Sequence, residues 1–331
     1  MNRIQELFLL KQQTTPLTTL AAAMSASFTG TDVLEVLKES KMDFDFDEEA
    51  VELVAGATFE QDAAVIGAEH GSGTLSIPLS DFYGTGVSKA PPYWGKALAI
   101  LCGFAQTDIT AGPEGYSYAP TSTWLGGLLR HYTGPQQVSG SSLAHLFYNM
   151  LATWDIDIAA NKFAKLNLTL GGAYGGESIL TQPSVTKMRA VSPAIKGATI
   201  SIFSNAYQLL TAKITGGQTL AHRTNVAETN GMGGSDLTDR KIKVALKFYA
   251  DPAITNIAKH PAQITRAATS SAFSIAWGTI GLTSPAFVIS GSAMQFTKPK
   301  LSDEGGIITF DVDGQLNAND ITLSVTRTKP S

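Results

Sequence analysis

The chain has 331 residues and a formal net charge of −4, with 44% hydrophobic but only 16% charged residues. This length suffices for two ordinary domains or one large β-domain, and so few charges indicate that much of the surface contacts other protein. Specific DNA binding is not expected because no concentrated basic footprint exists, and the single cysteine, Cys102, excludes an intrachain disulfide and a multi-cysteine metal site.

The N-terminal 40 residues precede the first clear strand. Residues 1–40 combine a helical pattern, with apolar residues at Ile4, Leu7 and Phe8, and a polar Thr-rich stretch. We expect this segment to form an N-terminal arm that joins neighbouring molecules rather than part of the core.

Strict alternation of apolar and acidic side chains predicts a strand at residues 42–46. Phe44 and Phe46 fall on one face of this strand. The opposite face carries Asp43, Asp45 and Asp47. We therefore expect a half-buried strand with an acidic side.

Two more strands and one helix follow in the first half. The period-two pattern predicts strands at residues 75–79 and 166–170. Between them, the prolines at 91–92 open a segment in which Trp94 and Leu98 recur at helical spacing. We expect this helix to pack on a sheet and to end near residue 103.

The second half repeats the order of strand, helix and strand. Residues 241–248 give the cleanest amphipathic strand, a short helical stretch begins at residue 251, and strands resume at 273–277 and 286–296. An internal duplication is therefore expected, and we place two β-domains at residues 41–190 and 191–331.

Two last strands are predicted at residues 308–312 and 321–325. The turn-rich sequence between them favours a hairpin with a long loop.

A separate long loop is predicted at residues 215–239, which show no clear apolar period. A loop of this length in a compact domain is usually functional or disordered. Its glycines are Gly216, Gly217, Gly231, Gly233 and Gly234.

No catalytic or metal-binding motif is found. The chain has no Gly-x-Ser-x-Gly elbow, its five histidines lack the spacing of zinc ligands, and Asp311–Gly314 departs from a calcium loop and favours a turn. Cys102 lies in an apolar run, which favours core packing. We therefore expect a non-catalytic protein without a cofactor or metal.

Neither a leader nor a membrane helix is predicted. The apolar run near the N-terminus is too short for a signal-peptide core, and no stretch approaches the ~18 apolar residues that a membrane helix requires. We expect a soluble protein without a membrane partner.

Several segments, taken in order, resemble the tail tube (major tail) protein family of long-tailed bacteriophages. In that family a strand is followed by a Pro-containing loop, a helix that ends in Cys-Gly-Phe and a Tyr-x-Pro-x-Ser segment. The similar segments here are residues 73–77, 89–104, 116–122, 163–172 and 236–248. The resemblance covers most of the chain, and its specificity comes from the order of the segments.

The resemblance implies a mainly β fold, a tail-tube-type β-sandwich or barrel with short packed helices, together with a long inter-subunit arm and loop. Given the repeated order of elements, it implies two tandem tube-like domains. The inner sheet would join the sheets of neighbouring copies into a continuous ring, and the arm and the loop at 215–239, with its glycines, would stack the rings.

The implied function is that of a structural subunit in a virion tail, made in the bacterial cytoplasm. Its partners would be further copies of itself and the tape measure, tail terminator and tail tip proteins. A trimer with pseudo-six-fold symmetry is the expected ring, and a hexamer is the alternative. DNA would pass through the lumen without specific binding during ejection, so we expect Asp43, Asp45 and Asp47 to line it with negative charge.

Two other interpretations fit the composition. The first is another self-assembling β-protein, such as a capsid decoration protein or a pilus-like subunit. The second is a carbohydrate-binding β-sandwich with Trp94, Trp124, Trp154 or Trp277 as the stacking platform. Trp94 and Trp277 lie in periodic apolar segments, which favours core positions for them, and we choose Trp124 as the residue to mutate.

Overall fold

Strands dominate the computed structural model, which confirms the predicted mainly β, sandwich- or barrel-like fold. The structure describes residues 6–49, 52–55, 58–61, 65–83, 89–123, 125–137, 141–185, 192–202, 205–249, 270–281, 284–297, 300–316 and 320–328. The described helical elements are α1 (Leu20–Met24), the 3-10 turn η1 (Gly30–Asp32) and α2 (Tyr93–Leu101).

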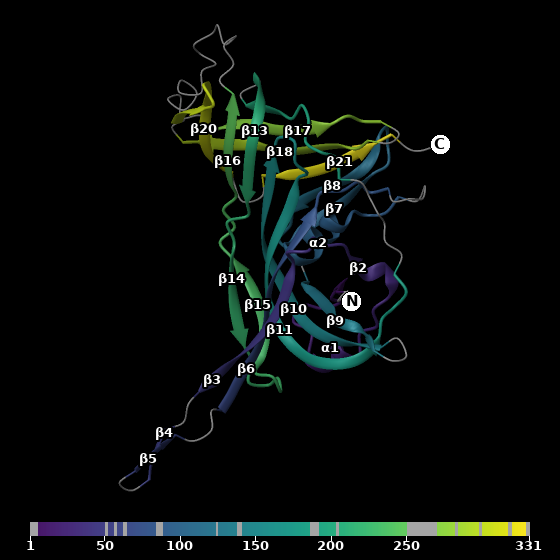
Figure 1. Ribbon diagram of the computed structural model, residues 1–331, viewed down its shortest axis with the longest axis vertical. Coiled ribbons are helices and arrows are strands. Elements are labelled where there is room, and N and C mark those ends of the chain that lie inside the picture. Colours follow the sequence, from purple (N-terminus) through teal and green to yellow (C-terminus); the bar gives the residue numbers. More distant parts are fainter. Residues whose placement is uncertain are drawn as a thin grey trace.

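The strands are numbered in chain order (Figure 1). The first eleven are β1 (Leu7–Gln12), β2 (Val33–Leu34), β3 (Lys41–Glu49), β4 (Glu52–Ala55), β5 (Thr58–Gln61), β6 (Val65–Pro78), β7 (Phe104–Ile109), β8 (Glu114–Pro120), β9 (Gly127–Gln137), β10 (Ser141–Ala159) and β11 (Lys165–Thr181). The others are β12 (Thr199–Ile202), β13 (Asn205–Thr215), β14 (Thr219–Thr224), β15 (Met232–Thr238), β16 (Lys243–Tyr249), β17 (Ser271–Gly278), β18 (Ala286–Phe296), β19 (Lys300–Glu304), β20 (Ile307–Leu316) and β21 (Thr322–Arg327).

One long antiparallel sheet runs through the molecule. Its strands are hydrogen-bonded in the order β3, β6, β11, β10, β13, β16, β20 and β19. The 19-residue strand β10 joins its two halves, since it pairs with β9 and β11 and, at its C-terminal end, with β13. Figure 1 shows β16 and β13 in the upper half of the molecule and β6 and β3 in the lower half.

The upper half closes on itself. Strand β13 pairs with β16, then β16 with β20, β20 with β18, β18 with β17, β17 with β12 and β12 with β13. Strand β21 adds to β18 and carries β8 and β7 on its other side. The second sheet, with β12, β17, β18 and β21, therefore faces the first across a shared core.

Aromatic and aliphatic side chains fill this core. The predicted helix is α2, which buries Trp94 against Tyr118 with ring centroids 5.0 Å apart. Gly95 permits this approach, because a Cβ at that position would overlap the Tyr118 ring and hydroxyl. Trp154 and Trp277 are also buried. The burial of Trp94 and Trp277 confirms the core positions predicted for these two residues.

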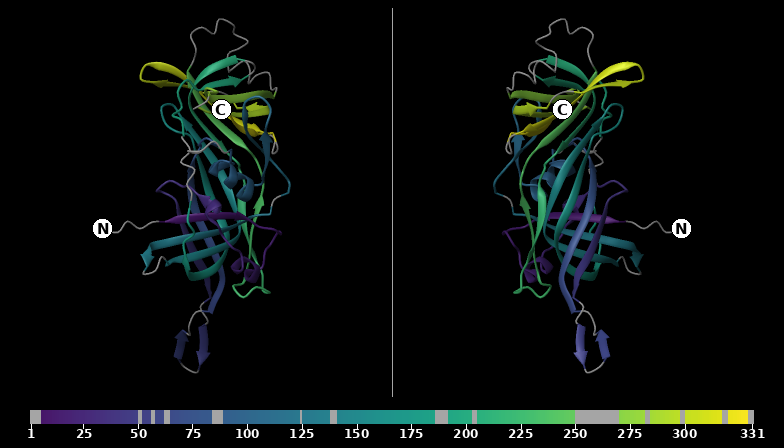
Figure 2. Two further views of the ribbon diagram at one scale, coloured as in Figure 1. Left: turned by 90° about the vertical axis from the view of Figure 1, so that its right-hand side faces the viewer. Right: turned by 90° about the vertical axis from the view of Figure 1, so that its left-hand side faces the viewer.

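Strands β3 and β6 extend beyond the body as a two-stranded ribbon, with the hairpin β4–β5 beyond its end (Figure 2). The period-two predictions for residues 42–46, 75–79, 166–170 and 241–248 correspond to β3, β6, β11 and β16. The strands predicted at 273–277 and 286–296 correspond to β17 and β18. In each of these cases the sequence pattern identified the strand.

The prediction of an N-terminal arm at residues 1–40 is wrong for the described part of that segment. Strand β1 pairs with β9 over its whole length and with β2 on its other side. Leu9 and Leu10 are fully buried in the main core. A strand buried on both faces gives a continuous apolar run, and such a run does not show the period of a strand.

The long loop predicted at residues 215–239 is a second error. It contains β14 and β15, which form a two-stranded hairpin over residues 219–238. This hairpin lies on the lower half of the long sheet, where Met232 and Tyr148 belong to a second small apolar cluster. Because every residue of β14 is at least partly exposed, the sequence lacks an apolar period there.

The predicted hairpin of strands 308–312 and 321–325 is also wrong. Strand β20 pairs with β16, β18 and β19, whereas β21 pairs with β18 and β8. Asp311–Gly314 lies within β20 and is not a turn. The helical stretch predicted from residue 251 lies outside the described residues, so the internal duplication and the two domains at 41–190 and 191–331 stay predictions.

Candidate functional site: a charged sheet face with two open edges

The long sheet has one buried and one charged face. Residues that are directly opposite each other on paired strands point to the same side. Asp157 of β10 pairs with Lys165 of β11 and Lys213 of β13, which places all three on one face. The same register continues through β16 to β20. The charged residues that share this face on these five strands are Asp155, Asp157, Lys165, Lys213, Lys243, Lys247, Asp311 and Asp313.

A hydrogen-bonded network occupies the middle of the charged face. The Asn167 amide donates to Asp155 Oδ1 and to Asp157 Oδ2, both at 2.8 Å. Its carbonyl oxygen accepts from Ser76 Oγ at 2.9 Å. This network links β6, β11 and β10, and it holds the two carboxylates side by side.

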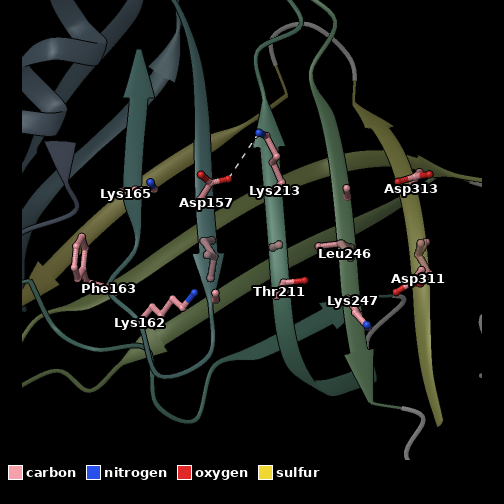
Figure 3. Close-up of a pocket in the computed structure, with 15 residues that line it drawn as sticks. Asp157, Lys162, Phe163, Lys165, Thr211, Lys213, Leu246, Lys247, Asp311 and Asp313 are labelled. Atoms are coloured by element: carbon pink, nitrogen blue, oxygen red, sulfur yellow. Dashed lines mark ion pairs between the residues drawn. The ribbon is translucent and has the colours of Figure 1, made fainter. Parts of the chain in front are cut away.

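The lysines of the face lie beside carboxylates. Lys213 Nζ is 3.9 Å from both Asp155 and Asp157, as Figure 3 shows for Asp157. Lys247 Nζ is 2.5 Å from Glu304, whose hydrogen bond raises the pKa of this lysine. A shallow groove runs over the face between β10 and β20, with Lys162 and the exposed Phe163 at one side. On the charged face of the five strands β10, β11, β13, β16 and β20, four aspartates balance four lysines.

The three aspartates predicted from the sequence extend the same face onto β3. Asp43 pairs with Ser72 and Asp45 with His70, and Asp47 lies 3.9 Å from the imidazole of His70. All three aspartates are exposed, which agrees with the predicted acidic side.

The other side of β3 is less buried than expected. Phe44 and Phe46 remain 41% and 37% exposed. Phe44 stacks on Tyr174, with ring centroids 4.5 Å apart and nearly parallel planes. The ribbon leaves the body at this point, so only part of each phenyl ring finds a partner.

The candidate loop glycines lie at close contacts within the chain. Gly216 packs on Trp154, and Gly217, which has φ of +58°, approaches the Lys241 carbonyl. Gly231 packs on the backbone of Ala68. Gly233 and Gly234 sit in β15, where Gly234 is close to Asn149. These glycines let hairpin β14–β15 lie on the sheet, and their role between rings stays a prediction.

Strand register brings histidines together that are distant in sequence. His131 and His145 are directly paired across β9 and β10, with ring centroids 6.4 Å apart. His70 stacks on His222 at 5.5 Å. His260 lies outside the described residues. The sequence spacing gave no signal for these pairs, because strand pairing creates the first and the packing of hairpin β14–β15 on the sheet creates the second.

Burial controls the chemistry of the first pair. His131 stacks on Phe8 at 4.3 Å, and its Nε2 has no hydrogen-bond partner in the described structure. Desolvation, and then the charge of His145, lower its pKa from 6.5 to about 4. Desolvation also lowers the pKa of His145, whose Nδ1 is 3.0 Å from the Tyr174 hydroxyl. Both rings are therefore neutral at pH 7.

Cys102 is fully buried, and burial raises the pKa of its thiol far above the usual range. Among the described residues, no three His, Cys, Asp or Glu side chains gather in a way that could hold a metal ion. In the same part of the chain, no helix has the length and apolar character needed to cross a membrane.

Both ends of the long sheet are open edges. Within the residues that the structure describes, β3 pairs only with β6, and β19 pairs only with β20. Each strand therefore presents one row of backbone donors and acceptors without a strand partner.

No protein-family model matches the chain, and no curated protein matches it in sequence.

Proposed function

We propose that the chain is the structural subunit of a phage tail tube, which self-assembles into stacked rings around a lumen that conducts DNA during ejection. One observation carries the proposal. The long sheet has a charge-balanced face on one side, the main core on the other, and an open strand at each end.

The open edges support self-assembly. An unpaired strand edge pairs readily with another chain, and natural proteins cover such edges unless they use them. Pairing of β3 in one copy with β19 in the next satisfies both rows of backbone groups and continues the sheet. The same contact repeated head to tail closes a ring.

The charged face suits a lumen that DNA passes without binding. Clustered lysines bind the phosphates of DNA. A duplex that must break these contacts at each step would slide more slowly through the lumen. In this face Lys213 is shared between Asp155 and Asp157, and Lys247 is paired with Glu304. The proposed lumen is therefore balanced in charge across β10 to β20 and acidic at β3, which refines the expectation of a uniformly negative lining.

The two groups of strands on either side of β10 support two tube-like units in each chain. Three chains then form a ring with pseudo-six-fold symmetry, and a hexamer is the alternative. The subunit is placed in the virion tail after synthesis in the bacterial cytoplasm. Its further partners are the tape measure, tail terminator and tail tip proteins, and it carries out no catalysis and uses no cofactor.

Imaging of the purified protein tests this proposal. Light scattering should give a mass of several chains, and electron microscopy should show hollow rings or stacked tubes. Solid particles would favour a capsid decoration protein or a pilus-like subunit, and a stable monomer at every concentration would contradict self-assembly of any kind.

A carbohydrate-binding sandwich is less well supported. Trp94, Trp154 and Trp277 are buried and offer no stacking platform. Trp124 lies outside the described residues. Glycan-array binding that disappears in Trp124→Ala would favour this second function over the tube.

A further inference from the structure

Exposed large apolar side chains concentrate in two places among the described residues. Seven of the twelve belong to two clusters. The first, the aromatic patch, consists of Phe44, Phe46, Leu143 and Ile179. The second, the hairpin knob, consists of Leu301, Ile307 and Ile308. Clusters of this kind mark interaction sites, whereas single exposed apolar residues are ordinary.

The aromatic patch is continuous across three strands. Phe44 of β3 stacks on Tyr174 and lies 5.8 Å from the ring of His145. Two residues beyond the paired His145 and Glu177, Leu143 of β10 and Ile179 of β11 face each other as a directly paired couple. They are 36% and 68% exposed. The patch therefore extends from the base of the ribbon to the ends of β10 and β11.

The rim of the patch is acidic. Glu69 pairs directly with Phe46, and Glu177 pairs with His145. Both carboxylates raise the pKa of Tyr174, as does its burial, the largest cause. A partner that covers this patch thus needs apolar side chains and gains from a nearby cation.

The hairpin knob lies at the end of β19–β20. Leu301, Ile308 and Ile307 are 67%, 58% and 51% exposed, and the turn at 305–306 has two glycines with positive φ. Lys300 begins the open strand and bears no ion pair in the described structure. Figures 1 and 2 show this hairpin in the upper half of the molecule, whereas β3 runs down from the body. The knob and the patch of one chain therefore do not meet.

Leu301 and Ile308 of the knob lie on the same side of the sheet as the aromatic patch, whereas Ile307, which pairs with Glu304, lies on the charged side. Lys300 pairs with Asp311 on the charged face, so Leu301 points to the opposite side, together with Ile308. Asp43 and Asp45 lie on the charged face of β3, so Phe44 and Phe46 point to the opposite side. When open edges join with their charged faces aligned, Leu301 and Ile308 lie on the same side of the joint as the patch.

We infer that the hairpin knob of one copy docks on the aromatic patch of a second copy, with Leu301 and Ile308 against Phe44 and Phe46. This inference rests on the proposed function, and it names the surfaces that join two subunits. A contact between different surfaces of identical chains is heterologous and repeats in one direction, as a ring requires.

The exposed area is consistent with this role. An aromatic side chain buries roughly 150–250 Å² in a contact, so the patch exposes on the order of 300 Å² of apolar surface. A stable interface buries about 800 Å² on each partner. The patch therefore supplies the apolar centre, and the backbone edges and the acidic rim supply the surrounding polar area.

Cross-linking between copies tests the geometry. Phe46→Cys in one preparation and Leu301→Cys in another are mixed and oxidised, which is informative because Cys102 is fully buried. A disulfide-linked dimer is expected from the mixture and from neither variant alone. Val226→Cys, at a fully exposed site, replaces Leu301→Cys as the matched control and should give no dimer with Phe46→Cys.

Assembly of surface variants separates this inference from the proposed function. Leu301→Asp should reduce the assembled fraction at least tenfold, whereas Ile280→Asp, at a residue that is 47% exposed elsewhere, should leave it unchanged. Full assembly of Leu301→Asp without a cross-link would overturn the inference and leave the tube proposal intact. Failure of the unmodified chain to assemble would contradict both.

Discussion

The two sheets share one core but present opposite kinds of surface. Strands β10, β11, β13, β16 and β20 alternate buried apolar residues with lysines and aspartates. Strands β12, β17 and β18 contain no Asp, Glu, Lys, Arg or His. A row of hydroxyl side chains crosses the second sheet instead, from Ser201 through Ser274 and Ser290 to Thr322.

This difference shows that the fold does not require the charges. Both sheets bury an alternating apolar side, and the second sheet does so with serine and threonine on the other side. The fold alone therefore does not account for the charges of the first sheet, and the proposed lumen is the explanation that we offer for them. Hydroxyl groups neither attract nor repel a phosphate backbone strongly, whereas paired charges set the electrostatic potential of a surface.

The largest expected effect tests whether the two sheets form one unit. Leu168 on β11 and Leu323 on β21 are each 1% exposed in the shared core. We expect Leu168→Ala and Leu323→Ala to lower the free energy of unfolding by about 2–5 kcal/mol each, because each leaves a cavity. Urea unfolding should show a single transition for both variants. Two separate transitions would show that the sheets unfold independently.

A second effect is a loss of stability in acid, which we expect to be larger around His131 than in the second sheet. The pKa of His131 is about 4 in the folded chain and 6.5 when exposed, so the unfolded chain binds more protons between these values. Its contribution to stability is complete above pH 6.5 and is lost as the pH falls through 4. The loss amounts to about 3 kcal/mol.

Hydrogen exchange at pH 4.5 and pH 7, corrected for the intrinsic rate, measures where this loss occurs. Protection should fall most in β1, β9 and β10, where local openings expose His131, and less in β12, β17 and β18, which carry no titrating side chain. His131→Phe preserves the stacking on Phe8 and should flatten the response. An equal loss of protection in both sheets would contradict a local cause.

A smaller effect compares the centres of the two faces. Asn167→Ala removes the donor shared by Asp155 and Asp157, and it should lower the free energy of unfolding by about 1 kcal/mol. Ser274→Ala on the hydroxyl row makes the same kind of truncation without losing a hydrogen bond in the described structure. We expect its effect in thermal unfolding to stay within about 0.5 kcal/mol.

The smallest effect concerns the exposed ion pairs. Lys213 is 54% exposed in its side chain, and solvent screens its attraction to Asp155 and Asp157. Lys213→Ala should therefore change the free energy of unfolding by less than about 0.5 kcal/mol, at low and high salt alike. A loss of several kcal/mol would show that this pair holds the sheet together.

Sequence patterns predicted the elements whose two faces differ. The alternation of lysines with Val244, Leu246 and Phe248 identified β16, and helical spacing around Trp94 identified α2. Sequence patterns failed for strands whose two faces have similar exposure. Leu7–Gln12 is mostly buried and β14 is mostly exposed, so neither strand shows a period.

The charged face was only partly predictable. The acidic side of β3 follows from local alternation at Asp43, Asp45 and Asp47. Its continuation across β10, β13, β16 and β20 depends on register between paired residues as far apart in sequence as Lys243 and Gln315, which a local pattern does not encode. The pairing of His131 with His145 was missed for the same reason.

The position of β21 determines when the subunit becomes complete during synthesis. Strand β8 pairs with β21, which the ribosome adds about 200 residues later. Arg327, the last residue of β21, also contacts the buried Asp81 of the first half. A nascent chain therefore has neither a closed core nor the β19 edge until most of it has emerged. Translation itself thus delays the hairpin knob, one of the two joining surfaces, and this delay protects the growing chain from premature contact between its own knob and finished copies.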